Sequence, residues 1–126
     1  KTFDNIWSLG DVMNAPNAKT MAAARKQAPT VAENIVADIN GRSPVAQYDG
    51  YGSCPLTVER GKIVLAEFGY GGALKPSFPS FILDGTKPSR AAWFLKEKLL
   101  PPIYWQAMLK GKEWMAKPEE IKVAAE

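Results

Sequence analysis

The clearest pattern of apolar and polar positions lies between Lys19 and Ile39. Apolar residues recur there every three or four positions, at Met21, Ala24, Ala28, Val31, Ile35 and Ile39. This spacing predicts an α-helix. Pro29 lies inside the pattern and is expected to kink or restart the helix, because proline removes a backbone N–H. Asn40-Gly41 predicts the helix end, with Gly41 at a positive φ.

Shorter apolar runs predict strands. Ile6–Leu9 is closed by Gly10-Asp11, as expected of a buried strand in an open α/β sheet. Cys54–Glu59 and Lys62–Tyr70 flank a glycine-containing turn and predict a hairpin. Phe78–Leu83 suggests an edge strand or an ordered loop.

The C-terminal third predicts two helices rich in aromatic residues. Ser89 is a candidate N-cap for a helix over Ala91–Leu100, and Pro101-Pro102 should break it before a second helix over Ile103–Lys110. These helices carry Trp93, Phe94, Tyr104 and Trp105, flanked by lysines. No run approaches the roughly 20 apolar residues that span a bilayer. The aromatic rings either lie in a membrane interface or pack on the hairpin, and the sequence leaves both readings open.

The amino-acid composition excludes several classes of function for this chain alone. The chain has 126 residues, 46% hydrophobic and 23% charged, as in one modest folded domain. The net charge of +3 comes from scattered lysines without a basic stripe, which argues against nucleic-acid binding. The chain contains no histidine, so Ser-His-Asp catalysis, Cys-His catalysis and His-ligated metals are excluded for this chain alone, and no metal site is expected.

Three places in the sequence are candidates for chemistry. Cys54 is the single cysteine, and glycines and Pro55 around it restrict the backbone, although a lone cysteine is more often a buried hydrophobe. Gly10-Asp11 is either a plain turn or a ligand contact at a strand end. Lys19 and Thr20 begin the long helix, where the dipole favours an anionic ligand.

Four stretches together resemble sulfide:quinone oxidoreductases, in the branch that includes the mitochondrial form. They are Phe3–Asp11, Pro16–Ala24, Tyr48–Leu56 and Ile63–Phe68. The most specific part is Asp-Gly-Tyr-x-Ser-Cys-Pro-Leu, from Asp49 to Leu56. The resemblance extends through the Tyr104-Trp105 region. It implies an α+β fold from the C-terminal part of a two-Rossmann-domain flavoprotein. Residues 1–45 would end the FAD-binding domain, and residues 46–126 would form a C-terminal domain facing the redox cysteine, the quinone and the membrane.

The resemblance also implies roles for single residues. Asp11 would accept a hydrogen bond from the FAD ribityl chain beside Gly10, and Lys19 and Thr20 would lie near the N1/C2-carbonyl edge of the flavin ring. Cys54 would be one of two redox cysteines that take up sulfide sulfur as a persulfide and pass electrons to FAD. Phe94, Tyr104 and Trp105 would line a quinone site, by position and chemistry. The parent enzyme would sit peripherally on a bacterial or mitochondrial inner membrane.

Two motifs of the family are absent from this sequence. It contains neither the glycine-rich FAD fingerprint nor a partner cysteine, and its first residues open in mid-pattern. We therefore expect a C-terminal fragment that is inactive alone and self-associates. Two alternatives remain: a sibling flavoprotein, such as a type II NADH:quinone dehydrogenase or a flavocytochrome flavin subunit, and a non-catalytic interaction domain in which Cys54 is a core residue.

Overall fold

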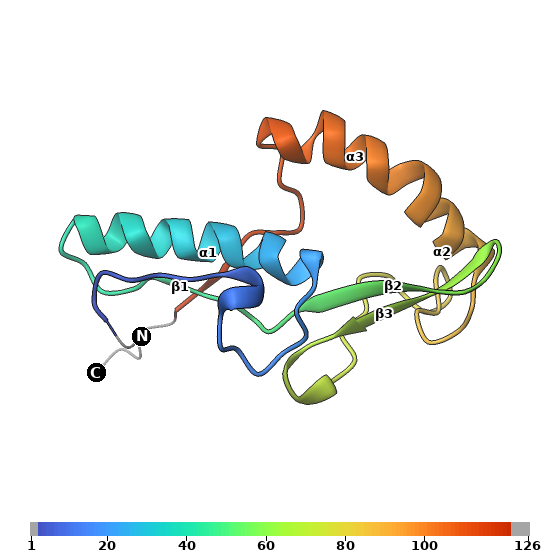
Figure 1. Ribbon diagram of the computed structural model, residues 1–126, viewed down its shortest axis with the longest axis horizontal. Helices are drawn as coiled ribbons and strands as arrows, with labels where there is room; N and C mark the ends of the chain where they lie inside the picture. The colour runs from blue at the N-terminus through green and yellow to red at the C-terminus, as the bar shows by residue number, and fades with distance from the viewer. Residues whose placement is uncertain (1–2, 122–126) are drawn as a thin grey trace.

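A computed structural model describes residues 3–121 and has the mixed helix and sheet content expected of an α+β fold. Helix α1 (Met21–Ile39) and the hairpin of β2 (Gly52–Glu59) and β3 (Lys62–Phe68) lie end to end along the long axis (Figure 1). Helices α2 (Arg90–Phe94) and α3 (Leu100–Gln106) form an arm that arches back over the hairpin towards the start of α1. The start of α1 therefore lies at the beginning of strand β2, and the arm lies near its end.

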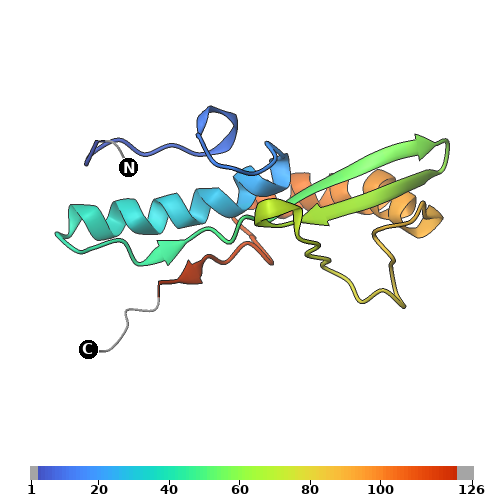
Figure 2. The ribbon, with the colours of Figure 1, turned by 90° about the horizontal axis from the view of Figure 1, so that it is seen from below.

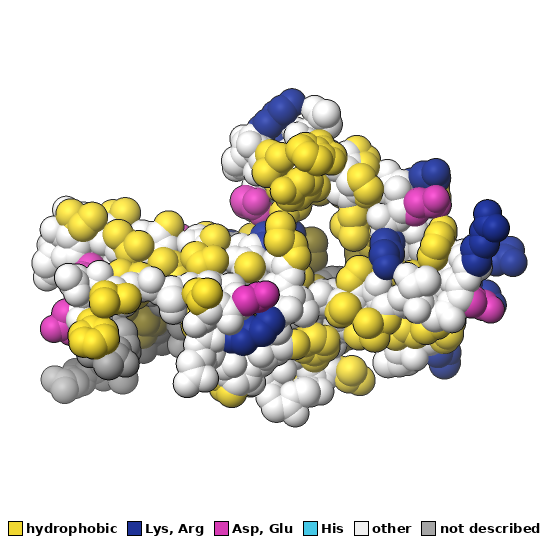
Figure 3. Space-filling model, viewed as in Figure 1, with side chains coloured by type: hydrophobic (Ala, Val, Ile, Leu, Met, Phe, Trp, Pro, Cys, Tyr) yellow, Lys and Arg dark blue, Asp and Glu magenta, His cyan; other side chains and the backbone are white. Residues whose placement is uncertain are grey.

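Helix α1 forms as predicted, but it buries a different face. Thr20 caps its start, and Arg42 N–H donates to Ala37 O, 2.9 Å away, beyond Gly41 at φ +67°. The helix continues through Pro29 without restarting. Its buried residues are Ala23, Gln27, Thr30, Asn34 and Ala37. Of the predicted apolar positions, Met21, Ala28 and Ile39 are exposed, whereas Ala24, Val31 and Ile35 are half-buried. Hydrophobic side chains are visible along this helix in Figure 3.

The polar face of α1 is buried because Asn34 binds strand β1 (Ala46–Gln47). Asn34 Oδ1 accepts from the N–H groups of Val45 and Ala46, at 2.9 and 3.0 Å, and its Nδ2 donates to Ala46 O at 2.8 Å. Strand β1 also pairs antiparallel with β4 (Glu119–Glu120), which brings the end of the described chain back beside α1 (Figure 2). The sequence patterns predicted neither of these two strands.

The hairpin is confirmed, with a turn in which Gly61 has φ +83°. Its two faces differ in burial, since side chains alternate along a strand. Ile63 and Leu65 face a core that contains Leu83 and Ala92. Cys54 pairs with Ala66, and both are half-buried on the opposite face.

The strand predicted over Ile6–Leu9 is wrong. Leu9 is extended, at φ −149° and ψ 168°, but the chain there pairs with nothing in either sheet of the described residues and then enters the 3-10 turn η1 (Gly10–Val12). A strand needs a neighbour to take its N–H and C=O groups, and the two described sheets are β1–β4 and β2–β3. Residues 78–83 likewise form an ordered loop of turns rather than an edge strand.

The predicted break at Pro101-Pro102 is also wrong. A π-helical segment, η3 (Leu95–Leu99), joins α2 to α3, and the two prolines lie in the first turn of α3. Proline is tolerated there, because first-turn N–H groups have no partner inside their own helix. The wider π turn thus lets the arm run on to the 3-10 turn η4 (Met108–Lys110), which ends at Gly111 as predicted.

Candidate functional site

The start of α1 lies against the start of β2. Thr20 Oγ1 accepts hydrogen bonds from the N–H groups of Ala23, at 3.1 Å, and Ser53, at 3.4 Å. A β-carbon at Gly52 would lie 2.8 Å from the Phe68 ring and 3.4 Å from Thr20 Oγ1, so only glycine permits this approach. Thr20 therefore contacts Ser53, the residue directly before Cys54.

Cys54 carries a free thiol on the less buried face of the hairpin. The core residues Ile63 and Leu65 point to the other face, together with the arm that packs there. Cys54 is therefore not part of the hydrophobic core of the described chain, which was its simplest alternative role.

The Gly10–Lys19 segment folds onto the first turns of α1. Gly10 has φ +70°, and its N–H donates to Gln27 Oε1 at 2.7 Å. Lys19 Nζ donates to Met13 O, which closes the segment into a loop. Asp11 lies exposed in η1, so the structure places it near the helix without a ligand-like enclosure.

The three candidate quinone residues lie on the arm. The rings of Tyr104 and Trp105 meet edge to face with centroids 5.1 Å apart. Phe94 is 55% exposed and Trp105 is 61% exposed. Lys96 ties the arm to β2, since its Nζ donates to Pro55 O and Thr57 Oγ1, each at 2.9 Å.

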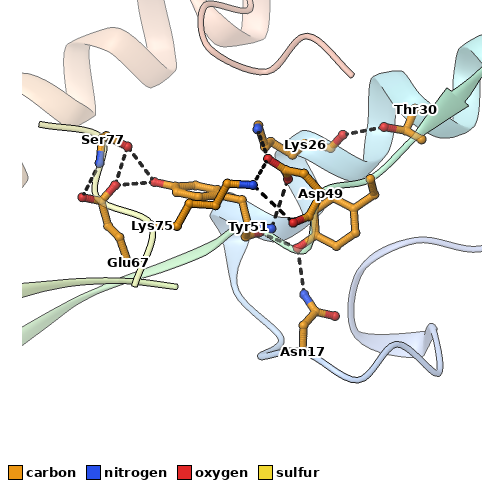
Figure 4. Close-up of polar contacts among 9 residues, drawn as sticks. Asn17, Lys26, Thr30, Asp49, Tyr51, Glu67, Lys75 and Ser77 are labelled. Atoms are coloured by element: carbon orange, nitrogen blue, oxygen red, sulfur yellow. Dashed lines mark hydrogen bonds and ion pairs between the residues drawn. The ribbon is translucent and has the colours of Figure 1, made fainter. Parts of the chain in front are cut away.

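Asp49 is the centre of a charged cluster that sequence reasoning missed (Figure 4). Its side chain is 6% exposed, and Oδ2 binds Lys26 Nζ at 2.7 Å and Lys75 Nζ at 2.6 Å. Burial alone would raise the pKa of Asp49, but the hydrogen bonds from the two lysines outweigh it and hold the pKa at about 2. The carboxylate therefore joins α1 to the segment after β3.

A second cluster continues from Asp49 along the chain. Asp49 Oδ1 accepts the N–H of Tyr51 at 3.1 Å, and the Tyr51 hydroxyl donates to Glu67 Oε1 at 2.6 Å. Glu67 is buried in β3 and also accepts the N–H of Ser77 at 3.0 Å. Burial raises the pKa of Tyr51, and its hydrogen bond to Glu67 raises it further. Lys26 Nζ lies 5.3 Å from the centroid of the Tyr51 ring.

The described residues also line an open pocket of about 500 Å³ between β3 and the loop that follows it. Leu65, Phe68, Leu74, Phe78 and Leu83 are among its apolar lining residues. No group of three or more His, Cys, Asp or Glu side chains within residues 3–121 is arranged to hold a metal ion. No helix in the same range is long and apolar enough to cross a membrane.

Comparison with known proteins identifies relatives of this chain. No protein-family model matches it. The chain is 44% identical over 115 residues to a mitochondrial sulfide:quinone oxidoreductase of Dictyostelium discoideum, covering 91% of the chain and 25% of that protein. It is 40% identical to the Schizosaccharomyces pombe enzyme of the same name, over 89% of the chain and 25% of that protein. Identity to the Mus musculus enzyme is 32%, over 88% of the chain and 24% of that protein. The chain thus spans about a quarter of the length of these relatives.

Proposed function

We propose that this chain, which is related to the sulfide:quinone oxidoreductases over about nine-tenths of its length, supplies the redox thiol Cys54 of such an enzyme. The observation that carries the proposal is the position of Cys54. Its strand begins at the N-terminus of α1, through Thr20 and Ser53, and its thiol lies on the half-exposed hairpin face. A thiol that exchanges sulfur with a small anion needs this accessibility.

The proposed reaction is a sulfur exchange followed by oxidation. HS⁻ attacks a disulfide between Cys54 and a second cysteine outside this chain, so one S–S bond breaks, another forms as a persulfide, and the other sulfur leaves as a thiol. A nucleophilic acceptor then removes the terminal sulfur. The two cysteines return to the disulfide by losing two electrons and their remaining proton. The reaction thus needs a two-electron acceptor beside Cys54.

The residues around the start of α1 are proposed to hold FAD as that acceptor. Lys19 and Thr20 stand at the N-terminus of α1, where an ammonium group and the helix dipole favour negative charge. Gly10 and Asp11 would contact the ribityl chain from the loop folded on the same helix. FAD, when bound, accepts the two electrons and passes them to quinone. Residues 1–45 would then belong to its binding domain and residues 46–126 to the redox and quinone domain.

The arm is proposed to face quinone and the membrane. Phe94 and Trp105 supply exposed aromatic surface, the Tyr104 ring is half-buried beside Trp105, and the lysines at positions 98 and 110 lie on the same arm. Figure 3 shows hydrophobic side chains gathered on the arm, beside an opening between the arm and the rest of the molecule. Aromatic rings with neighbouring lysines suit peripheral attachment to a membrane interface. The exposed apolar residues of α1, namely Met21, Val36 and Ile39, support self-association. The presence of a single cysteine in this sequence supports inactivity of the chain by itself.

The test is anaerobic bleaching of flavin absorbance by sulfide in the complete oxidoreductase. Cys54→Ser should abolish bleaching. Leu56→Ser is the matched control, since Leu56 lies on the same strand and face but is not proposed to react. If Cys54→Ser bleaches as fast as the unmodified enzyme, Cys54 is not the redox thiol. If NADH bleaches all three proteins and sulfide bleaches none, a type II NADH dehydrogenase is the better assignment.

A further inference from the structure

We infer that Asp49 is a positioning residue for Cys54, acting through the turn that leads into β2; this inference rests on the function proposed above. Asp49 touches none of the reacting atoms. Its carboxylate instead fixes the backbone between α1 and the strand that carries the thiol. Three sets of contacts support this role.

The first set fixes Asp49 to two other segments. Lys26 projects from the second turn of α1, and Lys75 follows β3, yet both ammonium groups reach the same oxygen of Asp49. Lys75 Nζ also lies 3.3 Å from the backbone oxygen of Asp49. Charge-assisted hydrogen bonds of a buried carboxylate are among the stronger polar contacts in proteins. Asp49 is therefore held at a fixed place between α1 and the hairpin.

The second set carries that position forward to β2. The N–H of Tyr51 donates to Asp49 Oδ1, which closes a tight turn around Gly50. The turn needs glycine, because Gly50 has φ +77° and an added β-carbon would lie 2.5 Å from the Tyr70 ring. The side chain of Tyr51 is then fixed by Glu67, which lies opposite Ser53 in the hairpin register.

The third set fixes the next residue from the other side. Ser53 N–H donates to Thr20 Oγ1 at the start of α1. The Asp49 cluster and Thr20 therefore both fix the residues before Cys54. Each connects those residues to α1, the cluster through Lys26 and Thr20 through its position as the helix cap. A shift of about 1 Å at a reacting group is enough to slow a reaction about a hundredfold. Loosening Asp49 should therefore slow the chemistry of Cys54.

Of the three charged residues Asp49, Lys26 and Lys75, we expect Asp49 to be the most sensitive to substitution. The Asp49 carboxylate forms ion pairs with both Lys26 and Lys75. Asp49→Asn therefore leaves these two ammonium groups near one another without a counter-charge. Lys75 is 42% exposed and can turn to solvent, whereas Lys26 is 21% exposed. Lys75→Met is therefore a milder second variant if Asp49→Asn folds poorly, and Lys75→Arg should restore the contact.

The experiment measures the two half-reactions separately in the complete oxidoreductase. Stopped-flow absorbance gives the rate of flavin reduction by sulfide and the rate of reoxidation by a soluble quinone. The matched control is Asp84→Asn. Asp84 also accepts a backbone N–H two residues on, from Thr86 at 3.0 Å, and pairs with Lys87 at 3.1 Å, but its turn does not lead into β2.

We expect Asp49→Asn to slow reduction by sulfide by about tenfold or more and to leave reoxidation unchanged. Lys75→Met should do the same to a smaller extent, and Lys75→Arg and Asp84→Asn should leave both rates unchanged. Equal slowing of both half-reactions, or unchanged reduction in Asp49→Asn, would overturn the inference. Cys54→Ser separates the two proposals, because if it still permits reduction by sulfide, the proposed function itself fails.

Discussion

Thr20 and Ser53 are joined by a hydrogen bond from the Ser53 N–H to the Thr20 hydroxyl oxygen, 3.4 Å away. The same oxygen caps α1 through the N–H of Ala23. One side chain therefore stabilises a helix start and also sets where the next element begins. Since Cys54 follows Ser53, this contact ties the strand that carries the thiol to the positive end of the helix dipole.

Removing the Thr20 hydroxyl should destabilise the fold. Thr20→Val keeps the shape and loses both hydrogen bonds, and we expect a loss of about 1–2 kcal/mol in the free energy of unfolding, as for other N-caps. Thr20→Ser keeps the oxygen and should lose much less. Urea unfolding followed by circular dichroism measures both. Equal losses in the two variants would mean that the methyl group, rather than the hydroxyl, matters at this position.

Gly50 should tolerate substitution less well than Gly61. Both have positive φ, of +77° and +83°, so alanine costs about 1–2 kcal/mol of backbone strain at either. Only at Gly50 would the new β-carbon also meet a ring, that of Tyr70. We therefore expect Gly50→Ala to lower the unfolding free energy clearly more than Gly61→Ala. Similar values for both would show that the Tyr70 ring moves aside freely.

The Asp49 cluster predicts a specific acid sensitivity. The folded pKa of about 2 lies below the usual 3.8, so Asp49 stabilises the fold at neutral pH, and this contribution disappears as pH falls from about 4 towards 2. The difference corresponds to at most about 2.5 kcal/mol. Unfolding free energies measured from pH 7 to pH 2 should show a shallower acid loss in Asp49→Asn than in the unmodified chain. A parallel pair of curves would contradict the assignment.

Local sequence patterns predicted most of the regular elements. Helical spacing located α1, Ser89 located the arm, and Gly61 located the hairpin turn. The structure departs from these patterns where contacts between residues far apart in the sequence determine the local arrangement. The lysines that bind Asp49 lie 23 and 26 residues away along the chain, and no periodicity relates them. Likewise, the buried face of α1 follows Asn34 and its bonds to β1, rather than the apolar stripe beside it.

The exposed arm provides a test between the two readings that the sequence left open. If Trp105 inserts into a membrane interface, Trp105→Ala should weaken binding of this chain to liposomes with anionic lipid by about tenfold, from the loss of buried apolar area. Phe81→Ala is the control, because Phe81 is 87% exposed but lies on the loop after β3. Co-sedimentation gives the affinities, and a blue shift of tryptophan fluorescence should accompany binding. If neither variant changes binding, the arm aromatics are not a membrane surface. Loss of thermal stability in Trp105→Ala without any change in liposome binding would favour packing as the role of this ring.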